Sequence, residues 1–234
     1  ARIAVDGRAE GDRARRAQFA LVLLTLLLAA TMLFSLTSGA SDVTADTVLR
    51  AIFGAADAVS MRDRIIIHEI RLPRLIMGAL VGAALAVSGA VMQGLFRNPL
   101  ADPGLVGVSS GASLGAVGMI VLGPTLFGPL NAALGALALP LTAFLGGLVT
   151  TFILYQVATR HGRTSVATML LAGIALAALA MAVTGILIFM ADDRQLRDLT
   201  FWSLGSLAGA TWPKISAIAP IIIAALAVSP FLAR

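Results

Sequence analysis

Residues that could carry out catalysis are few in this sequence, and they are not spaced in any catalytic pattern. His68 and His161 are the only histidines, and His68-Glu69 is followed by Ile-Arg-Leu, which does not complete the His-Glu-x-x-His zinc motif. Cysteine is absent from the 234 residues, so they hold no thiolate metal site or disulfide. Asp192 and Asp193 are expected to be solvated loop charges. We therefore predict no catalytic residue, no cofactor site and no metal site in this chain, and we expect it not to be an enzyme.

The amino-acid composition limits the class of protein to which the chain can belong. Hydrophobic residues make up 59% of the chain and charged residues 12%, with a mean hydropathy of +0.95. Soluble domains carry about 25% charged residues, so these values exclude a disordered chain and argue against a water-soluble enzyme. The net charge is +5, but the basic residues are spread between apolar runs and form no basic face. Nucleic-acid binding is therefore not predicted.

Six apolar segments are long enough, or nearly so, to cross a bilayer as helices, which takes about 20 residues. They are Ala17–Leu36, Leu75–Phe96, Leu105–Leu122, Ala132–Ala158, Val166–Met190 and Ile215–Ala233. None contains Asp, Glu, Lys, Arg or His. Because backbone polar groups must be satisfied within lipid, the sequence predicts an all-α, polytopic transmembrane helical bundle.

The first span and the residues before it set the expected orientation. Arg13, Arg15 and Arg16 precede a run of about 18 apolar residues, longer than the apolar region of most signal peptides. We expect an uncleaved anchor, with a cleaved signal peptide as the alternative. An alternating topology places nine of the 17 basic residues on the N-terminal side, which is nearly neutral, but the cluster before the first span favours a cytoplasmic N-terminus. Residues 1–16 are thus predicted to be a cytoplasmic tail and residues 17–234 one membrane domain.

The polar connections contain short elements of their own. Thr44–Phe53 has a helical pattern and predicts a short helix outside the membrane. Asn98–Gly104 carries strong turn signals, and Pro73 suits the first turn of the second span. After the fifth span, a charged piece, Asp192–Asp198, precedes an apolar piece, Phe201–Leu207, which is too short to span and is expected to be a half-helix or an interfacial segment.

Small residues recur every four positions in the second and third spans. They are Gly78, Gly82, Ala86, Ala90 and Gly94 in the second, and Gly107, Gly111 and Gly115 in the third. Such stripes let helix backbones approach closely. They predict a tightly packed helical bundle and do not by themselves indicate a pore.

The source of energy for any transport is expected to lie outside this chain. Carriers driven by protons or sodium keep ionisable residues within their spans, and the six spans have none. The sole lysine, Lys214, follows Trp212-Pro213 and cannot complete a phosphate-binding P-loop. A transporter of this kind would depend on a partner that supplies energy. A passive channel, a secondary carrier and a membrane scaffold without transport activity remain alternatives.

An ordered set of motifs resembles the FecCD/BtuC-type permease family, the membrane subunits of bacterial ABC importers for iron-siderophores, haem and cobalamin. The motifs occupy residues 71–74 (RLPR), 87–94 (VSGAVMQG), 98–107 (NPLADPGLVG), 109–112 (SSGA), 164–165 (TS), 170–175 (LLAGIA) and 201–207 (FWSLGSL). The resemblance runs from the first span to Arg234. It implies the family fold, which has about ten spans and about a hundred more residues. The six spans here would then be a part of that fold that ends before the main coupling helix for the ATPase, either because the sequence is truncated or because the subunit is split.

The resemblance also implies a function and a set of partners. The chain would be a permease subunit that translocates a metal chelate (haem, iron-siderophore or cobalamin) into the cytoplasm by ATP-driven alternating access. A second copy would complete a homodimer in the bacterial inner membrane, with two ATP-binding subunits and a periplasmic substrate-binding protein. ATP and magnesium would bind the partner ATPase, and this chain would hold no cofactor.

Individual residues acquire expected roles from the same resemblance. Arg71 and Arg74 match docking points for glutamates of the binding protein, with anchoring of a helix end as the alternative. Four residues match two layers of a cytoplasmic gate, although turn and capping roles would also explain them; they are Asn98, Leu100, Thr164 and Ser165. Arg197 matches a basic position at the periplasmic mouth of the pathway.

Overall fold

The computed structural model describes residues 7–39, 41–54 and 59–232, and it is helical apart from one small hairpin. The chain forms two compact units: Ala1–Val81 with Leu207–Ala224, and Gly82–Ser206 with Ala225–Arg234. Within the described residues, five helices are long and apolar enough to cross a membrane. The predicted all-α transmembrane bundle is thus confirmed, and each unit has its own packing.

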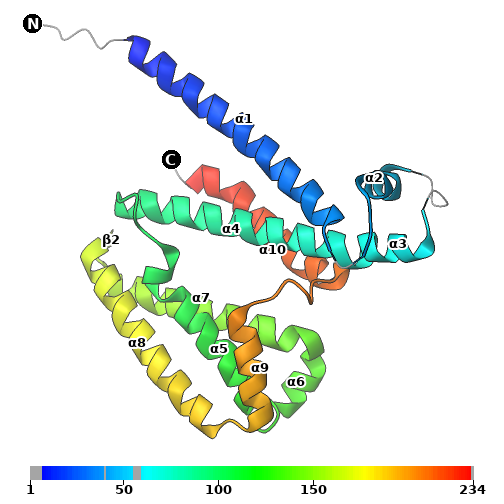
Figure 1. The fold of residues 1–234 in the computed structure, drawn as a ribbon. Helices are drawn as coiled ribbons and strands as arrows, with labels where there is room; N and C mark the ends of the chain where they lie inside the picture. The colour runs from blue at the N-terminus through cyan, green and yellow to red at the C-terminus, as the bar shows by residue number, and fades with distance from the viewer. Residues whose placement is uncertain (1–6, 40, 55–58, 233–234) are drawn as a thin grey trace, which may run out of the picture. The chain divides into compact units, whose positions relative to one another are not determined.

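The first unit contains the N-terminal helices (Figure 1). They are α1 (Gly7–Thr37), α2 (Ala45–Phe53), α3 (Met61–Ile65), the π-helical turn η1 (Ile66–Arg71), the start of α4 (Leu72–Phe96) and most of α10 (Trp212–Leu232). Helix α1 runs without a break across residues 16 and 17, where the predicted cytoplasmic tail meets the predicted membrane domain. The helix does not mark where the membrane begins, and this boundary stays a prediction. Residues 1–6 of the predicted tail lie outside the described residues.

The predicted short helix after the first span is confirmed as α2. The Thr44 hydroxyl caps its N-terminus by accepting the Thr47 backbone N–H at 3.3 Å, and Gly54 ends it. Its buried Val48 joins Leu36, Val43 and Ile67 in the main apolar cluster of this unit. The end of α1 is therefore packed against α2 and η1.

The second span begins earlier than its apolar run indicates. Helix α3, the turn η1 and helix α4 form one continuous helical stretch, Met61–Phe96. Proline inside a helix removes one backbone hydrogen bond and crowds the carbonyl one turn earlier. Here the π-helical turn directly precedes Pro73, and the Leu72 N–H bonds to the Ile67 carbonyl, five residues back. The wider π-helical turn accommodates the proline ring. The helix therefore extends in the N-terminal direction past Pro73, into the charged residues before it.

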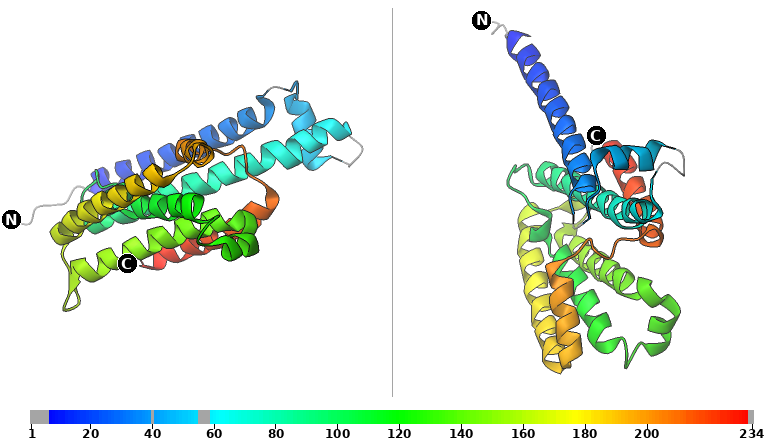
Figure 2. Two further views of the ribbon diagram at one scale, coloured as in Figure 1. Left: turned by 90° about the horizontal axis from the view of Figure 1, so that it is seen from below. Right: turned by 45° about the vertical axis from the view of Figure 1, so that its right-hand side comes forward.

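The second unit is built around three helices that pack together: α5 (Val108–Leu122), α7 (Ala138–Ala158) and α8 (Val166–Met190). Helix α5 contacts both others, and α7 also contacts α8, as Figures 1 and 2 show. Shorter elements connect them: η2 (Pro103–Val106), α6 (Gly128–Leu134), η3 (Gly135–Leu137), β1 (Thr159–Arg160), β2 (Arg163–Thr164) and α9 (Asp193–Leu204).

Two apolar clusters mark the opposite ends of this helix group. One contains the buried Val106, Leu154, Ala158 and Met169, with Phe96 of α4 packed against it. The other contains Val117 and Val121 of α5, Leu187 of α8 and Leu199 of α9. Helices α5 and α8 therefore run in the same direction from the first cluster to the second, and α7 runs back. This order agrees with the alternating topology expected from the sequence.

Two other predicted spans are shorter as helices than their apolar runs. For the predicted Leu105–Leu122, only Val108–Leu122 is α-helical, because Gly107 adopts a left-handed conformation (φ 77°) after η2. Fifteen residues rise about 22 Å, short of the roughly 30 Å of hydrocarbon. The predicted Ala132–Ala158 is interrupted at Gly135 (φ 51°), so α7 starts at Ala138.

The segment after the fifth span forms one helix, α9, which joins the charged piece to the first residues of the apolar piece and ends at Leu204. The half-helix or interfacial placement of the apolar piece stays a prediction. Asp192 is exposed, as expected of a solvated charge, but it caps this helix instead of lying in a loop. The Asp192 carboxylate accepts the Gln195 backbone N–H at 2.8 Å, and the Gln195 side chain accepts the Asp192 N–H at 3.0 Å. This capping box starts a helix directly after α8.

Candidate functional site

Asn98 and Leu100, predicted as one layer of the gate, lie in the turn that follows α4. The Asn98 side-chain oxygen accepts the Leu100 backbone N–H at 2.9 Å, and the Asn98 carbonyl accepts from Ala101 at 3.1 Å. These bonds fix the turn locally, as short Asn side chains often do. Leu100 is nevertheless 84% exposed, so this apolar side chain projects from a well-defined turn without packing in its own unit.

Thr164 and Ser165, the predicted second layer, lie between α7 and α8. Strands β1 and β2 form a hairpin with Thr159 opposite Thr164, and the hydroxyls of these two residues are 2.9 Å apart. This hairpin was not predicted from the sequence. His161-Gly162, where both residues have positive φ, is the turn signal that could have identified it. Ser165 caps α8 by accepting the Thr168 N–H at 3.3 Å.

The two predicted gate segments start from the same apolar cluster. Phe96 precedes the Asn98 turn by two residues, and Ala158 directly precedes the hairpin; both pack in the cluster around Val106 and Met169. The structure therefore brings the two segments to one end of the second unit. Each is short, polar and held by its own backbone bonds. A gating function for the four residues stays a prediction.

Arg71, one of the two predicted docking residues, is engaged within its own unit. Its guanidinium donates to the Leu36 carbonyl at the end of α1. It also donates to Ser41, at 3.1 Å to the carbonyl and 2.7 Å to the hydroxyl. Arginine presents several donors in a planar fork, which suits such a multiple contact. The half-buried Arg71 thus ties the loop after α1 to η1.

The other two predicted arginines are exposed. Arg74 lies one turn beyond Arg71 and donates to the Ala208 carbonyl at 3.3 Å. Arg197 lies on α9 in the second unit. The docking role of Arg74 and the pathway role of Arg197 stay predictions, because no partner is present to test them.

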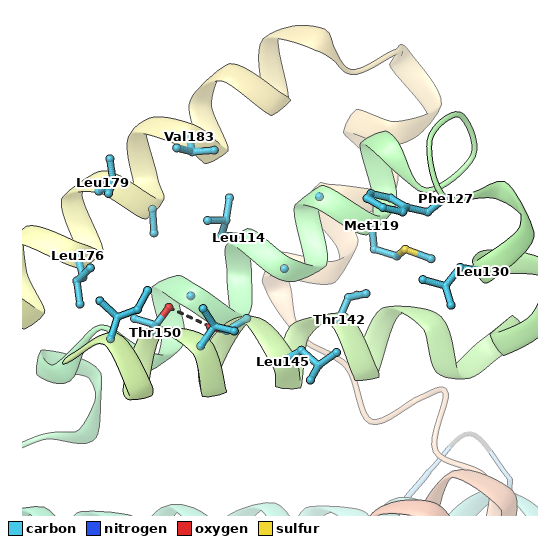
Figure 3. Close-up of a pocket in the computed structure, with 17 residues that line it drawn as sticks. Leu114, Met119, Phe127, Leu130, Thr142, Leu145, Thr150, Leu176, Leu179 and Val183 are labelled. Atoms are coloured by element: carbon cyan, nitrogen blue, oxygen red, sulfur yellow. Dashed lines mark hydrogen bonds between the residues drawn. The ribbon is translucent and has the colours of Figure 1, made fainter. Parts of the chain in front are cut away.

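An apolar cavity of the second unit lies among α5, α6, α7 and α8 and has a volume of about 540 Å³ (Figure 3). Leucines and glycines dominate its lining, with Phe127 at one end, and Thr142 and Thr150 are the hydroxyl residues in it. The Thr150 hydroxyl donates to the Gly146 carbonyl at 2.9 Å, so the helix backbone already satisfies this polar group. The cavity offers apolar surface and no charge.

Among the described residues, no group of three or more His, Cys, Asp or Glu side chains comes together. His68 contacts the Ala51 carbonyl through Nε2 at 2.9 Å, and its own carbonyl accepts the Trp212 indole N–H at 2.9 Å. These bonds give His68 a structural position between α2 and α10.

Comparison with known proteins shows where the chain has relatives. The FecCD transport family matches residues 26–234. A cobalamin import permease of Halobacterium salinarum is 44% identical over 70% of this chain and 42% of its own length. A hemin transport permease of Yersinia pestis is 46% identical over 66% of this chain and 45% of its own length. A vitamin B12 import permease of Klebsiella pneumoniae is 39% identical over 86% of this chain and 55% of its own length.

A solved structure supports the fold. A metal-chelate type ABC transporter in an inward-facing conformation superposes with a TM-score of 0.69 at 28% identity, over 88% of this chain and 59% of that chain. The chain therefore spans about half the length of the curated relatives it matches.

Proposed function

Since this chain belongs to the FecCD transport family, we propose that it acts as the transmembrane permease subunit of an ABC importer. The family match over residues 26–234 carries this proposal. The inward-facing transporter that shares the fold supports it, as do permease relatives named for cobalamin and hemin transport. The substrate would be a metal chelate such as haem, an iron-siderophore or cobalamin.

The proposed mechanism is alternating access driven by ATP on a separate subunit. ATP binding must favour one of two permease conformations for this to work. The transport unit would contain two copies of the permease, two ATP-binding subunits and a substrate-binding protein. We propose an inner-membrane location with a cytoplasmic N-terminus, which agrees with the arginine cluster before α1.

The proposed cytoplasmic gate consists of the Asn98 turn and the Thr164-Ser165 hairpin. Both segments lie at one end of the second unit, which supports a common function. Leu100 is 84% exposed, and an apolar side chain of this size gains stability when another surface covers it. In the proposed homodimer, the Leu100 side chains would close the constriction, and small helix shifts would open it.

The proposed docking site for the binding protein consists of Arg71 and Arg74 on the periplasmic side. Charge-assisted hydrogen bonds between arginine and carboxylate are stronger than neutral ones, and their planar geometry orients the partner. Arg197, exposed on α9, would lie at the periplasmic mouth of the pathway. The pathway itself would hold the substrate weakly, so that affinity resides in the binding protein.

Uptake by the complete transporter in proteoliposomes tests the proposal. We expect uptake of one metal chelate that depends on ATP and stops when the P-loop lysine of the ATPase is replaced. Uptake that continues without the ATPase would favour a channel or secondary carrier. No uptake of haem, ferric siderophore or cobalamin by a correctly assembled complex would favour a scaffold.

A paired charge reversal tests the docking site. Arg71→Glu with Arg74→Glu is expected to abolish uptake, because like charges would face the carboxylates of the binding protein. The matched control is Arg62→Glu with Arg64→Glu, two exposed arginines of α3, which should leave uptake close to normal. Normal uptake by the first variant would exclude docking through these arginines.

A further inference from the structure

The π-helical turn η1 leaves one backbone carbonyl without a donor from its own helix. In an α-helix the Leu72 N–H would bond to the His68 carbonyl, four residues back, but here it bonds to the Ile67 carbonyl. The residue five positions after His68 is Pro73, which has no N–H. The helical stretch Met61–Phe96 therefore supplies no backbone N–H to the His68 carbonyl.

Trp212, in the first turn of α10, supplies the missing donor. Its indole N–H bonds to the His68 carbonyl at 2.9 Å, although the two residues are 144 positions apart in the sequence. Both residues are half-buried and lie in the first unit. A carbonyl that loses its partner away from water costs free energy. The bond from Trp212 therefore stabilises the π-helical form of η1.

The side chain of His68 extends the same junction to α2. Its Nε2 lies 2.9 Å from the Ala51 carbonyl, which belongs to the last turn of α2, where carbonyls lack partners within the helix. The neighbouring Ile67 has no exposed surface and packs in the cluster with Leu36 and Val48. The orientation of η1 thus determines whether α2, α10 and the apolar cluster are held together.

A cavity of about 440 Å³ lies beside the indole of Trp212, within the first unit. It is lined by Met61, Arg64, Ile65, His68, Glu69 and Trp212. Met61 is 71% exposed and Ile65 is 45% exposed, so these side chains do not enclose the ring. The indole therefore has room to withdraw, and its bond to the His68 carbonyl is the contact that such a movement breaks.

We propose that the Trp212 indole is a latch that selects between two hydrogen-bond registers of η1. With the indole in place, the Leu72 N–H bonds to the Ile67 carbonyl and the turn is π-helical. When the indole withdraws, the His68 carbonyl accepts the Leu72 N–H and η1 rewinds as an α-helix. Because the π-helical turn holds one extra residue, rewinding rotates α3 by roughly 100°, the angle of one residue in an α-helix. The rotation carries Ile67 out of its cluster and His68 away from Ala51.

The latch makes the start of the second span respond to the position of α10. A displacement of α10 that withdraws Trp212 frees η1 and α2 together. Coupling between separate segments requires an element with two discrete arrangements that both segments bias, and the two registers of η1 provide one. This inference concerns the packing of the first unit and does not depend on the proposed permease function.

Cysteine labelling at Ile67 tests the latch. These 234 residues contain no cysteine, so Ile67→Cys in the full permease, otherwise free of reactive cysteines, gives one buried thiol. Trp212→Phe keeps an aromatic ring but lacks the N–H, and it should speed reaction with a maleimide about tenfold by populating the rewound form. Trp202→Phe, on α9 of the second unit, is the matched control. An unchanged rate with Trp212→Phe, or an equal rise with Trp202→Phe, would overturn the latch.

A second reporter keeps this test independent of the fold of one variant. Val48 is 1% exposed and packs in the same cluster from α2. Val48→Cys should therefore show the same rise with Trp212→Phe, because departure of Ile67 uncovers it. If Val48→Cys stays protected while the Trp212→Phe permease is folded, η1 does not leave the cluster and the proposal is wrong.

Replacement of Pro73 tests whether Trp212 acts through the His68 carbonyl. Pro73→Ala restores a backbone N–H five residues after His68, so the helix itself can satisfy this carbonyl. In the Pro73→Ala background, Trp212→Phe should change the labelling rate less than about twofold, because coupled residues are not additive. A full tenfold rise in that background would show that Trp212 acts through packing alone, which contradicts the latch.

A distance measurement tests the rotation itself. Spin labels on Arg64→Cys of α3 and Ser216→Cys of α10, both exposed positions of the first unit, report how α3 is turned. Trp212→Phe should shift their distance distribution by several ångströms, and Trp202→Phe should not. Faster labelling of Ile67→Cys without any shift in this distance would mean that η1 loosens without rewinding, and the register switch would be refuted.

Discussion

Single residues determine how closely the helices of the second unit approach. A Cβ on Gly111 would overlap the Thr150 hydroxyl, and a Cβ on Gly146 would overlap the Gly111 carbonyl oxygen. The small-residue stripe of the third span therefore predicted close packing correctly. In the stripe of the second span, a Cβ on Gly78 would lie 3.3 Å from the Leu207 side chain, whereas Gly82 and Gly94 have no described atom within 4 Å of a Cβ position. The sequence shows that one face of a helix carries only small residues, but it does not show which helix packs against that face.

The first prediction concerns Gly111. Gly111→Ala should destabilise the permease by about 1–3 kcal/mol, because α5 and α7 must separate to admit the methyl group. Gly118→Ala on the same helix is the control, since nothing lies within 4 Å of its Cβ position and alanine favours the helix. The measurement is the thermal unfolding midpoint of the purified permease in detergent. Equal midpoints for the two variants would contradict the close contact.

At the scale of elements, the least predictable features were those set by local backbone geometry. The long apolar helix α8 was predicted with its observed bounds, because 25 apolar residues leave little choice. The π-helical turn before Pro73, the hairpin at His161-Gly162 and the continuous α9 were missed. Each depends on a few hydrogen bonds that hydropathy does not register. Among the site residues, the turn and capping geometry of Asn98 and Ser165 could be anticipated, but the contacts of Arg71 with the end of α1 could not.

The second prediction concerns the start of α9. Asp192→Ala removes the capping carboxylate and should lower stability by about 1 kcal/mol. The Gln195 amide also donates to the Val121 carbonyl at 3.2 Å, so loss of the cap should loosen the contact between α9 and the end of α5. Asp193→Asn, which leaves the capping box intact, should have a smaller effect. Unfolding midpoints and hydrogen exchange in α9 measure both changes, and an effect of Asp193→Asn as large as that of Asp192→Ala would argue against the cap.

At the scale of the whole molecule, hydropathy predicted a multi-pass helical membrane protein, and the motifs predicted its family. What could not be predicted is how the chain is divided into packed units, since that depends on contacts between residues distant in sequence. Neither the hydropathy nor the motifs predict the substrate, because relatives named for different chelates match the same chain.

The third prediction concerns the orientation of the second unit in the membrane. The 25 residues of α8 rise about 37 Å and separate the gate end from the α9 end. Leu100→Cys and Arg160→Cys should therefore react with an impermeant maleimide only from the cytoplasmic side, and Asp193→Cys only from the outside. Intact and permeabilised spheroplasts distinguish the sides. Labelling of Leu100→Cys and Asp193→Cys from the same side would refute the alternating topology.

The glycine contact between α5 and α7 has a mechanical consequence. Where side chains separate two helices, rotamer changes allow one helix to slide over the other. At Gly111 and Gly146 the two backbones meet directly beside the Thr150 side chain, so little side-chain movement is available to absorb such sliding. Helices α5 and α7 should consequently translate and rotate as one rigid body. Because η2 leads into α5 and the hairpin follows α7, a displacement at either of these connections is transmitted directly to the other.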